Sequence, residues 1–348
     1  MKALVYDGPG KIAVVDKPKP ELRSADEAIL RVVRTTICGT DLHIIKGDVP
    51  TVEQGRTLGH EGLGVIEELG SEVKGLKKGD RVLISCITGC GVCSFCKKSM
   101  KDQCKGNGWI LGHIIDGTQA EYVRIPHASN NLYPVPEGVD ERTLLLFSDI
   151  LPTGLEVGTL RGKVKPGDTV AIVGAGPVGL ACCITAQLYS PKKIVCFDRD
   201  DERLAAAKKL GATDVINPSG GNARELASKH FGEIDGFDVV MEAVGVPATF
   251  QMCQDLVGIG GSIANVGVHG TKVNLDIDRL WIRSTNISMA LVSAHTIPML
   301  LDLLAAGKVN ASDLITHDFT FGEILKAYDI FTRAAETKSL KVSIDFQS

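Results

Sequence analysis

A glycine-rich turn between a buried strand and an apolar helix constrains the fold of this chain most. The stretch "TVAIVGAGPVGLACCITAQL" predicts a strand over 169–173, then G-x-G-x-x-G at Gly174, Gly176 and Gly179, then a helix. Such glycines permit a tight bend, let the backbone approach a pyrophosphate and let helix and strand pack closely. The phosphates would lie at the helix N-terminus, where amide donors and the helix dipole favour anions.

An acidic residue follows the fingerprint at the distance that a dinucleotide site requires. The strand "KIVCFD" ends at Asp198, nineteen residues after Gly179. A carboxylate there accepts hydrogen bonds from ribose hydroxyls and repels a 2′-phosphate, which favours NAD over NADP. Arg199 comes next and could hold that phosphate, so NADP stays open as an alternative. The predicted cofactor-binding set is Gly174, Gly176, Pro177, Val178, Gly179, Asp198, Arg199, Val266 and Val268.

The strand–helix alternation continues beyond this point. Helices are predicted over 201–212 and 247–257, and strands over 237–245 and 260–268. Alternation of this kind predicts an α/β fold with a parallel sheet covered on both faces. We expect this doubly wound nucleotide domain to span 152–291, with four cysteines in its core: Cys182, Cys183, Cys196 and Cys253.

Four further cysteines fall within fifteen residues, in the pattern C-x2-C-x2-C-x7-C. The N-terminus reaches charge and glycine too soon for a signal peptide, so we expect a cytoplasmic chain, in which disulfides are rare. A redox motif would need only two of the four. Four thiolates instead close a tetrahedral zinc shell and leave no position for substrate. We predict a structural zinc lobe over 86–110, held by Cys90, Cys93, Cys96 and Cys104.

Composition excludes several classes of partner. A length of 348 residues favours two domains. The formal charge of −4 gives no electrostatic reason to expect nucleic acid as a partner. No uninterrupted apolar run approaches the roughly 20 residues that span a bilayer, so no membrane partner is expected.

Several short motifs, in order, resemble one known family. They are C-G-T-D-x-H at 38–43, G-H-E at 59–61, the four-cysteine loop, "SDILPTG" at 148–154 and G-A-G-P-V-G at 174–179. The chain resembles the zinc-dependent medium-chain alcohol dehydrogenases over essentially its whole length. The resemblance implies a β-rich, GroES-like catalytic domain built from 1–151 and 292–348, a Rossmann domain inserted between them, and an active site in the cleft.

The resemblance also implies a second, catalytic zinc held by Cys38, His60 and a third ligand. The liver and yeast enzymes use a cysteine there, but this chain has none between Cys104 and Cys182. Asp149 stands at the matching place, as in bacterial secondary alcohol dehydrogenases and glutathione-independent formaldehyde dehydrogenases. Carboxylate oxygen is an acceptable zinc ligand; the alternative is that Asp149 caps a helix. Glu61 can complete the shell when substrate is absent.

By the same resemblance, a proton relay leads from the alcohol to solvent. An open zinc position acts as a Lewis acid on the alcohol, which gives hydride to NAD. Thr40 takes the proton and passes it through the nicotinamide ribose to His43. Asp41 accepts a hydrogen bond from the distal nitrogen of His60 and fixes its orientation. The remaining histidines are left without a role: His113, His127, His230, His269, His295 and His317.

The substrate pocket implied by the resemblance is apolar, with Trp109, Cys86, Val268 and Leu291 at its positions. Such a pocket favours short secondary or primary alcohols, and the matching ketones and aldehydes, over polyols. Two alternatives stay open: a formaldehyde dehydrogenase or dismutase, and a non-catalytic descendant of the fold, although the predicted ligands and relay are intact. The resemblance also implies a homotetramer, with a dimer seam at the edge strand near "SIANVGV".

Overall fold

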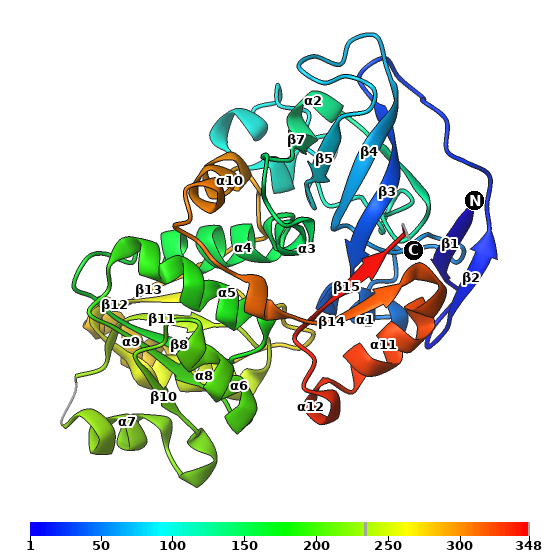
Figure 1. Ribbon diagram of the computed structural model, residues 1–348. Helices are drawn as coiled ribbons and strands as arrows, with labels where there is room; N and C mark the ends of the chain where they lie inside the picture. Colours follow the sequence, from blue (N-terminus) through cyan, green and yellow to red (C-terminus); the bar gives the residue numbers. More distant parts are fainter. Residues whose placement is uncertain (107, 233–234, 347–348) are drawn as a thin grey trace. The chain divides into compact units, whose positions relative to one another are not determined.

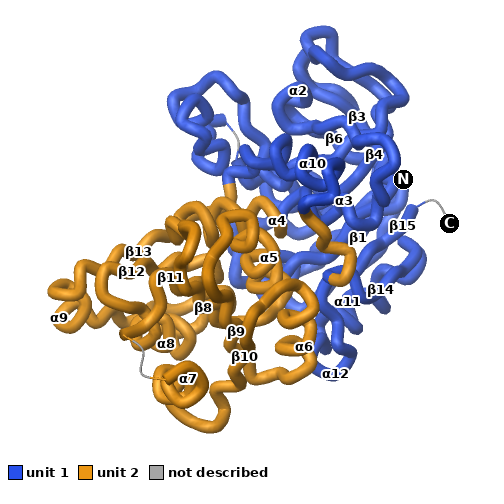
Figure 2. Tube along the Cα trace, turned by 60° about the vertical axis from the view of Figure 1, so that its left-hand side comes forward, with its two compact units in different colours: residues 1–149, 293–308, 314–348 blue, residues 150–292, 309–313 orange. Residues whose placement is uncertain are grey.

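The computed structural model describes residues 1–106, 108–232 and 235–346, and the chain divides into two compact units (Figure 2). Unit 1 comprises Met1–Asp149, Ser293–Lys308 and Leu314–Ser348; unit 2 comprises Ile150–Val292 and Val309–Asp313. The predicted divisions at 151/152 and 291/292 lie within two residues of these limits. The segment 309–313 differs, because its contacts group it with unit 2.

Unit 1 is built around a mixed sheet of order β14-β15-β3-β4-β5-β7, with β6 also paired to β3 (Figure 1). The C-terminal strand β15 pairs with β3, so both ends of the chain contribute to one domain. All pairs are antiparallel except β14 with β15. The strands are β3 (Ala28–Thr36), β4 (Gly62–Leu69), β5 (Arg81–Ile84), β6 (Tyr122–Ile125), β7 (Leu132–Pro134), β14 (Ile315–Thr320) and β15 (Lys341–Asp345), beside the hairpin β1 (Lys2–Tyr6) and β2 (Ile12–Asp16).

The longest helix near the C-terminus of unit 1 packs against the core with one apolar face. In α11 (Ile324–Thr332) the buried residues Ile324, Ala327, Tyr328 and Phe331 recur at helical spacing. They share a core cluster with Ile44 of α1 (Gly39–Lys46). The other short helices wholly within unit 1 are η1 (Cys96–Lys98), η2 (Lys101–Gln103), α2 (Ala128–Asn131), α3 (Glu141–Leu144), η3 (Leu145–Phe147), α10 (Ile297–Ala305), η9 (Phe321–Glu323) and α12 (Ala334–Thr337).

Unit 2 is the predicted doubly wound domain, and its sheet has the order β10-β9-β8-β11-β12-β13 with every pair parallel. The strands are β8 (Thr169–Val173), β9 (Lys193–Phe197), β10 (Asp214–Ile216), β11 (Phe237–Glu242), β12 (Val257–Asn265) and β13 (Asn286–Met289). The strand order reverses between β8 and β11, which is where such sheets bind a ligand outside their carboxyl ends. The predicted α/β fold class is confirmed.

Helices of unit 2 follow the strands in alternation: α5 (Pro177–Ala186), α6 (Asp201–Lys209), α7 (Ala223–Phe231), α8 (Pro247–Leu256) and α9 (Ile277–Leu280) (Figure 1). The unit begins with α4 (Ile150–Thr153) and the π-helix η4 (Gly154–Leu160). β12 begins three residues earlier than predicted, because Val257 already pairs with Phe237. The four cysteines assigned to the core, Cys182, Cys183, Cys196 and Cys253, are fully buried as predicted.

One helical run, Glu141–Leu160, is the single stretch among the described residues with the length and apolar composition of a membrane span. The sequence prediction missed it, because Asp149 and Glu156 interrupt the apolar residues. Of its most apolar window, 83% is buried within the protein, as in the core helix of a soluble domain.

Candidate metal and cofactor sites

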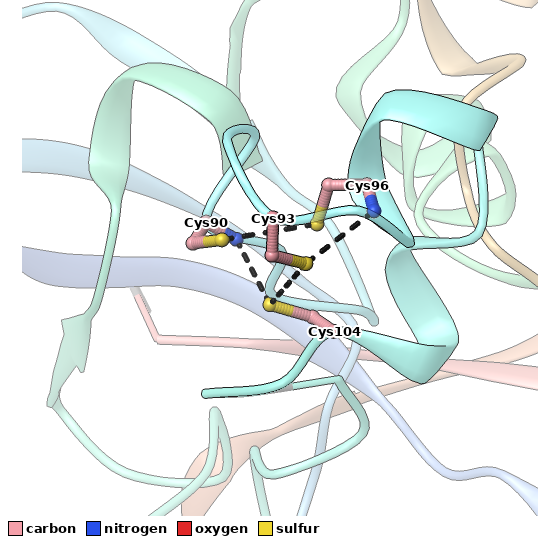
Figure 3. A group of neighbouring side chains, drawn as sticks. All are labelled: Cys90, Cys93, Cys96 and Cys104. Atoms are coloured by element: carbon pink, nitrogen blue, oxygen red, sulfur yellow. Dashed lines mark hydrogen bonds between the residues drawn. The ribbon is translucent and has the colours of Figure 1, made fainter.

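The four-cysteine lobe brings its sulfur atoms to one point (Figure 3). The short turns η1 (Cys96–Lys98) and η2 (Lys101–Gln103) fold the loop back, so that Cys104 returns to Cys90 and Cys93. The Sγ atoms of Cys90 and Cys96 lie 4.0 Å apart, as do those of Cys93 and Cys104. A tetrahedron with zinc–sulfur bonds of about 2.3 Å has sulfur–sulfur edges of about 3.8 Å. The donor set therefore fits a closed zinc shell.

Backbone amides favour the thiolate form of Cys93 and Cys104, whereas burial raises the pKa of Cys96 to about 12. The N–H of Cys90 donates to the sulfur of Cys104 at 3.3 Å, and the N–H of Cys96 donates to the sulfur of Cys93 at 3.5 Å. Amides of Cys96 and Lys105 lower the pKa of Cys93 to about 6. The lobe is anchored within unit 1 by Ser293, whose hydroxyl accepts from the N–H of Lys101 and donates to the carbonyl of Ser99.

A second donor group gathers Cys38, His60, Glu61 and Asp149, whose ligand atoms all lie within 4.8 Å of one another. Cys38 is the N-cap of α1, His60 and Glu61 immediately precede β4, and Asp149 precedes α4. Nε2 of His60 lies 3.3 Å from Oδ2 of Asp149, and Sγ of Cys38 lies 3.8 Å from the same oxygen. The structure thus brings the predicted ligands together.

These donors suit zinc in kind and in spacing. Bonds of about 2.0 Å to nitrogen and oxygen give a tetrahedral edge of about 3.3 Å, the separation found between His60 and Asp149. Burial lowers the pKa of His60, whereas Asp149 and Cys38 raise it, and the net pKa lies well above its ordinary value. The group therefore favours positive charge at its centre, as a metal site requires. Thiolate, imidazole and carboxylate leave one position of a tetrahedral ion for substrate.

Asp41 does not make the hydrogen bond predicted for it. Its Oδ2 accepts from the N–H of Cys38 at 2.9 Å and from Nε2 of Gln119 at 3.2 Å. Its Oδ1 is buried and has no hydrogen-bond partner among the described residues, His60 included. The reason is local: Asp41 is the third residue of α1, and its carboxylate caps the helix N-terminus. Its relation to His60 is electrostatic: burial raises the pKa of Asp41, and the nearby His60 lowers it.

The two relay residues lie on α1, beside the second donor group. Thr40 Oγ1 is 3.6 Å from the sulfur of Cys38. His43, three residues later, lies on the same side of the helix and its side chain is 43% exposed. Nδ1 of His43 lies 3.0 Å from Oδ2 of Asp48, which orients the ring. The positions agree with a path from the ligands toward solvent.

The predicted pocket residues are divided between the two units. In unit 1, Cys86 is buried with its sulfur 3.5 Å from Oδ1 of Asp149. The ring of Trp109 contacts that of His113, with centroids 4.4 Å apart and the planes tilted by 32°. Val268 and Leu291 belong to unit 2, where they are 67% and 43% exposed.

The fingerprint glycines adopt the geometry expected of a dinucleotide site. Gly174 has φ +100°, a conformation that favours glycine. Gly176 is the N-cap of α5 and Pro177 is its first residue, as suits a helix N-terminus. Oδ2 of Asp198 accepts from the N–H of Ala175 at 2.7 Å, which places the carboxylate against the phosphate-binding turn. Of the other predicted cofactor residues, Val178 is half-buried, Arg199 is exposed and Val266 is buried.

Two charged residues near these sites were missed by the sequence prediction. Nη1 of Arg203 in α6 lies 3.7 Å from where a Cβ on Gly176 would stand, so a cation lies beside the fingerprint. Its position five residues after Asp198 in the sequence could have indicated that it lies near the cofactor site. Lys341 forms a buried ion pair with Glu61. No local pattern indicates it, because 280 residues separate the two.

Comparison with known proteins agrees with this geometry. The model of the "Alcohol dehydrogenase GroES-like domain" matches residues 24–137, and that of "Zinc-binding dehydrogenase" matches 177–306. A curated alcohol dehydrogenase of Cupriavidus necator is 35% identical, over 99% of this chain and 98% of its own. The chain belongs to the zinc-dependent medium-chain alcohol dehydrogenases.

Solved structures of this family extend the comparison. The zinc-dependent alcohol dehydrogenase 2 of Streptococcus pneumonia, in its apo form, is 49% identical with a TM-score of 0.95, covering 100% of this chain and 99% of its own. A short chain alcohol dehydrogenase of Escherichia coli, 27% identical with a TM-score of 0.90, was solved with NADH. A putative zinc-binding dehydrogenase of Sinorhizobium meliloti, 28% identical with a TM-score of 0.88, was solved with NADP. The matches to the Escherichia coli and Sinorhizobium meliloti structures each cover 99% of this chain and 99% of the other chain.

Proposed function

We propose that this protein oxidises short secondary or primary alcohols reversibly to ketones or aldehydes, with hydride transfer to NAD. The observation that carries the proposal is the convergence of Cys38, His60 and Asp149 beside Thr40 on α1. A donor set of three with a hydroxyl at its edge suits chemistry on an alcohol, whereas the four-cysteine lobe is closed. The proposal includes two zinc ions per chain, one catalytic and one structural.

The side chains around the donor set supply the remaining chemistry. Zinc, when held by Cys38, His60 and Asp149, supplies a Lewis acid that lowers the pKa of an alcohol. The hydroxyl of Thr40 accepts the alcohol proton, since one hydroxyl can accept and donate at once. His43 delivers the proton to solvent, because an imidazole can both accept and donate a proton and its ring is held by Asp48.

The preference for NAD rests on Asp198. The family neighbours include one structure with NADH and one with NADP, so the fold alone does not select the cofactor. The carboxylate of Asp198 is bound to the fingerprint turn through the N–H of Ala175. A 2′-phosphate at this place would meet that negative charge, whereas ribose hydroxyls would donate to it.

An assay of nicotinamide reduction with 2-propanol tests the proposal, with NAD and NADP side by side and with a chelator-treated sample. We expect turnover with NAD that the chelator abolishes and added zinc restores. Turnover with NADP alone would refute the cofactor assignment. Turnover with formaldehyde and with no alcohol would favour the formaldehyde dehydrogenase or dismutase instead.

We further propose that the protein is a homotetramer. Exposed large apolar side chains are frequent in the last third of unit 2, and we infer that self-association covers them. Ile259, Ile277, Trp281, Ile282 and Met289 are each more than 60% exposed. Light scattering at micromolar concentration should give four times the mass of the chain, and a monomer would refute the proposal.

A further inference from the structure

A buried ammonium group is bound to one of the four candidate metal ligands. Nζ of Lys341 donates to Oε1 of Glu61 at 2.7 Å, to Oε2 of Glu61 at 3.0 Å and to the carbonyl of Ile37 at 3.2 Å. These contacts use all three N–H donors of the ammonium. The side chains of Lys341 and Glu61 are only 4% and 1% exposed. The ammonium therefore has a fixed place, and both oxygens of Glu61 are bound to it.

Strand pairing explains how the end of the chain reaches this place. β15 pairs with β3, with Ser343 opposite Thr36, so Lys341 lies beside the residues that lead into Cys38. β4 pairs with the other edge of β3, and Glu61 directly precedes β4. The positions of Lys341 and Glu61 are therefore set by the sheet of unit 1.

The ion pair affects how many donors are available to the catalytic metal. Cys38, His60, Glu61 and Asp149 together would fill all four positions of a tetrahedral zinc ion. Such a shell leaves an exogenous molecule no position on a tetrahedral ion, so that it could bind only if one donor left or the ion became five-coordinate. Of the four donors, Glu61 is the one bound to an alternative cation.

We propose that Lys341 is a positioning residue that holds Glu61 out of the metal's coordination shell, in contrast to the ligation that the resemblance implies for Glu61, and so keeps one position available to an exogenous ligand. This inference rests on the proposed function. Without Lys341, the buried carboxylate of Glu61 loses its counter-charge, which is unfavourable in the interior. The nearest remaining cation would be the metal, because the ligand atoms of all four donors lie within 4.8 Å of one another. Glu61 would then close the shell.

The test uses the full chain with cobalt(II) in place of zinc and imidazole as the exogenous ligand, followed by the visible absorption spectrum. The four-cysteine lobe is closed in every variant, so the imidazole-dependent change reports the other site alone. The variants are Lys341→Met, Lys341→Arg and the double variant Lys341→Met with Glu61→Gln. The rate at which a chelator removes cobalt from the imidazole-responsive site is a second readout.

We expect imidazole to shift the spectrum of the unmodified protein and of Lys341→Arg with similar Kd values. In Lys341→Met the Kd should rise at least tenfold and the chelator should remove the metal more slowly, because Glu61 has become a fourth ligand. The double variant should restore the imidazole response. A merely structural role for Lys341 predicts the opposite change in metal release, namely faster loss in both Lys341→Met and the double variant.

Each contrary outcome has its own meaning. Unchanged imidazole affinity in Lys341→Met would overturn the inference while leaving the proposed function intact. Absence of any imidazole response in the unmodified protein would contradict the open position on which the proposed function depends. If Lys341→Met does not fold, Lys341→Gln replaces it, since glutamine is neutral and polar, and the same rise in Kd is expected.

Discussion

Alanine substitutions at two glycines of the fingerprint should have different effects, one on stability and the other on cofactor binding. A Cβ on Gly179 would lie 1.8 Å from the carbonyl oxygen of Gly174, and no side-chain rotation can relieve a clash with backbone. A Cβ on Gly176 would meet only Arg203, at 3.7 Å, and Gly176 already has φ −70°. Gly179→Ala therefore strains the fold, whereas Gly176→Ala adds a methyl group where the pyrophosphate approaches.

The magnitudes follow from these contacts. Overpacking a core costs about 1–3 kcal/mol, and the backbone clash places Gly179→Ala near the upper end. At roughly 2–4 °C per kcal/mol for a domain of this size, Tm should fall by about 6–12 °C. Gly176→Ala should leave Tm within about 2 °C of the unmodified protein but raise the Kd of NADH at least tenfold, a loss of about 1.4 kcal/mol.

Differential scanning fluorimetry without cofactor measures the first effect, and quenching of protein fluorescence by NADH measures the second. The variants serve as matched controls for each other. An equal fall in Tm in both variants would refute the conclusion that Gly179, and not Gly176, is needed for helix packing. An unchanged NADH affinity in Gly176→Ala would refute the conclusion that the pyrophosphate approaches the backbone at Gly176.

Three further predictions concern the metal lobe, the relay and the cofactor. Cys104→Ser should lower Tm and the zinc content by one ion per chain while activity assayed in the cold persists, and loss of cold activity at unchanged Tm would contradict a structural role. Thr40→Val should lower kcat by about 10²–10⁴-fold and leave the Kd of NADH unchanged, whereas Thr40→Ser should retain most of the activity. Equal kcat values in the two variants would show that Thr40 is not part of the relay. Asp198→Ala should lower the ratio of kcat/KM with NAD to kcat/KM with NADP at least tenfold. An unchanged ratio would show that Asp198 does not select the cofactor.

The nucleotide-binding unit and the four-cysteine lobe could be predicted from the sequence because their signals are local, whereas Cys38, His60 and Asp149 are far apart in the chain and were identified through the resemblance to the family. The glycine fingerprint, the strand before it and Asp198 after it lie within 30 residues, and with the strand–helix alternation that follows they indicate a parallel, doubly wound sheet. The cysteine spacing likewise predicts a metal site, because two-residue gaps let neighbouring thiolates converge on one ion.

Features that depend on pairing of distant segments could not be predicted in this way. Lys341 reaches Glu61 only because β15 pairs with β3. Asp41 was expected to hold His60, but its carboxylate satisfies the amide of Cys38 at the start of α1, a choice that spacing alone does not reveal. The segment 309–313 joins unit 2 because of its contacts, for which the linear order gives no sign.

We propose that the chemistry belongs to Cys38, His60 and Asp149, and not to the four-cysteine lobe. The most direct measurement is the zinc content and the alcohol-dependent reduction of NAD in Asp149→Ala, determined on the same preparation. We predict about one zinc ion per chain retained in the lobe, with turnover abolished. Full turnover in this variant would contradict the account and remove Asp149 from the ligands of the catalytic metal.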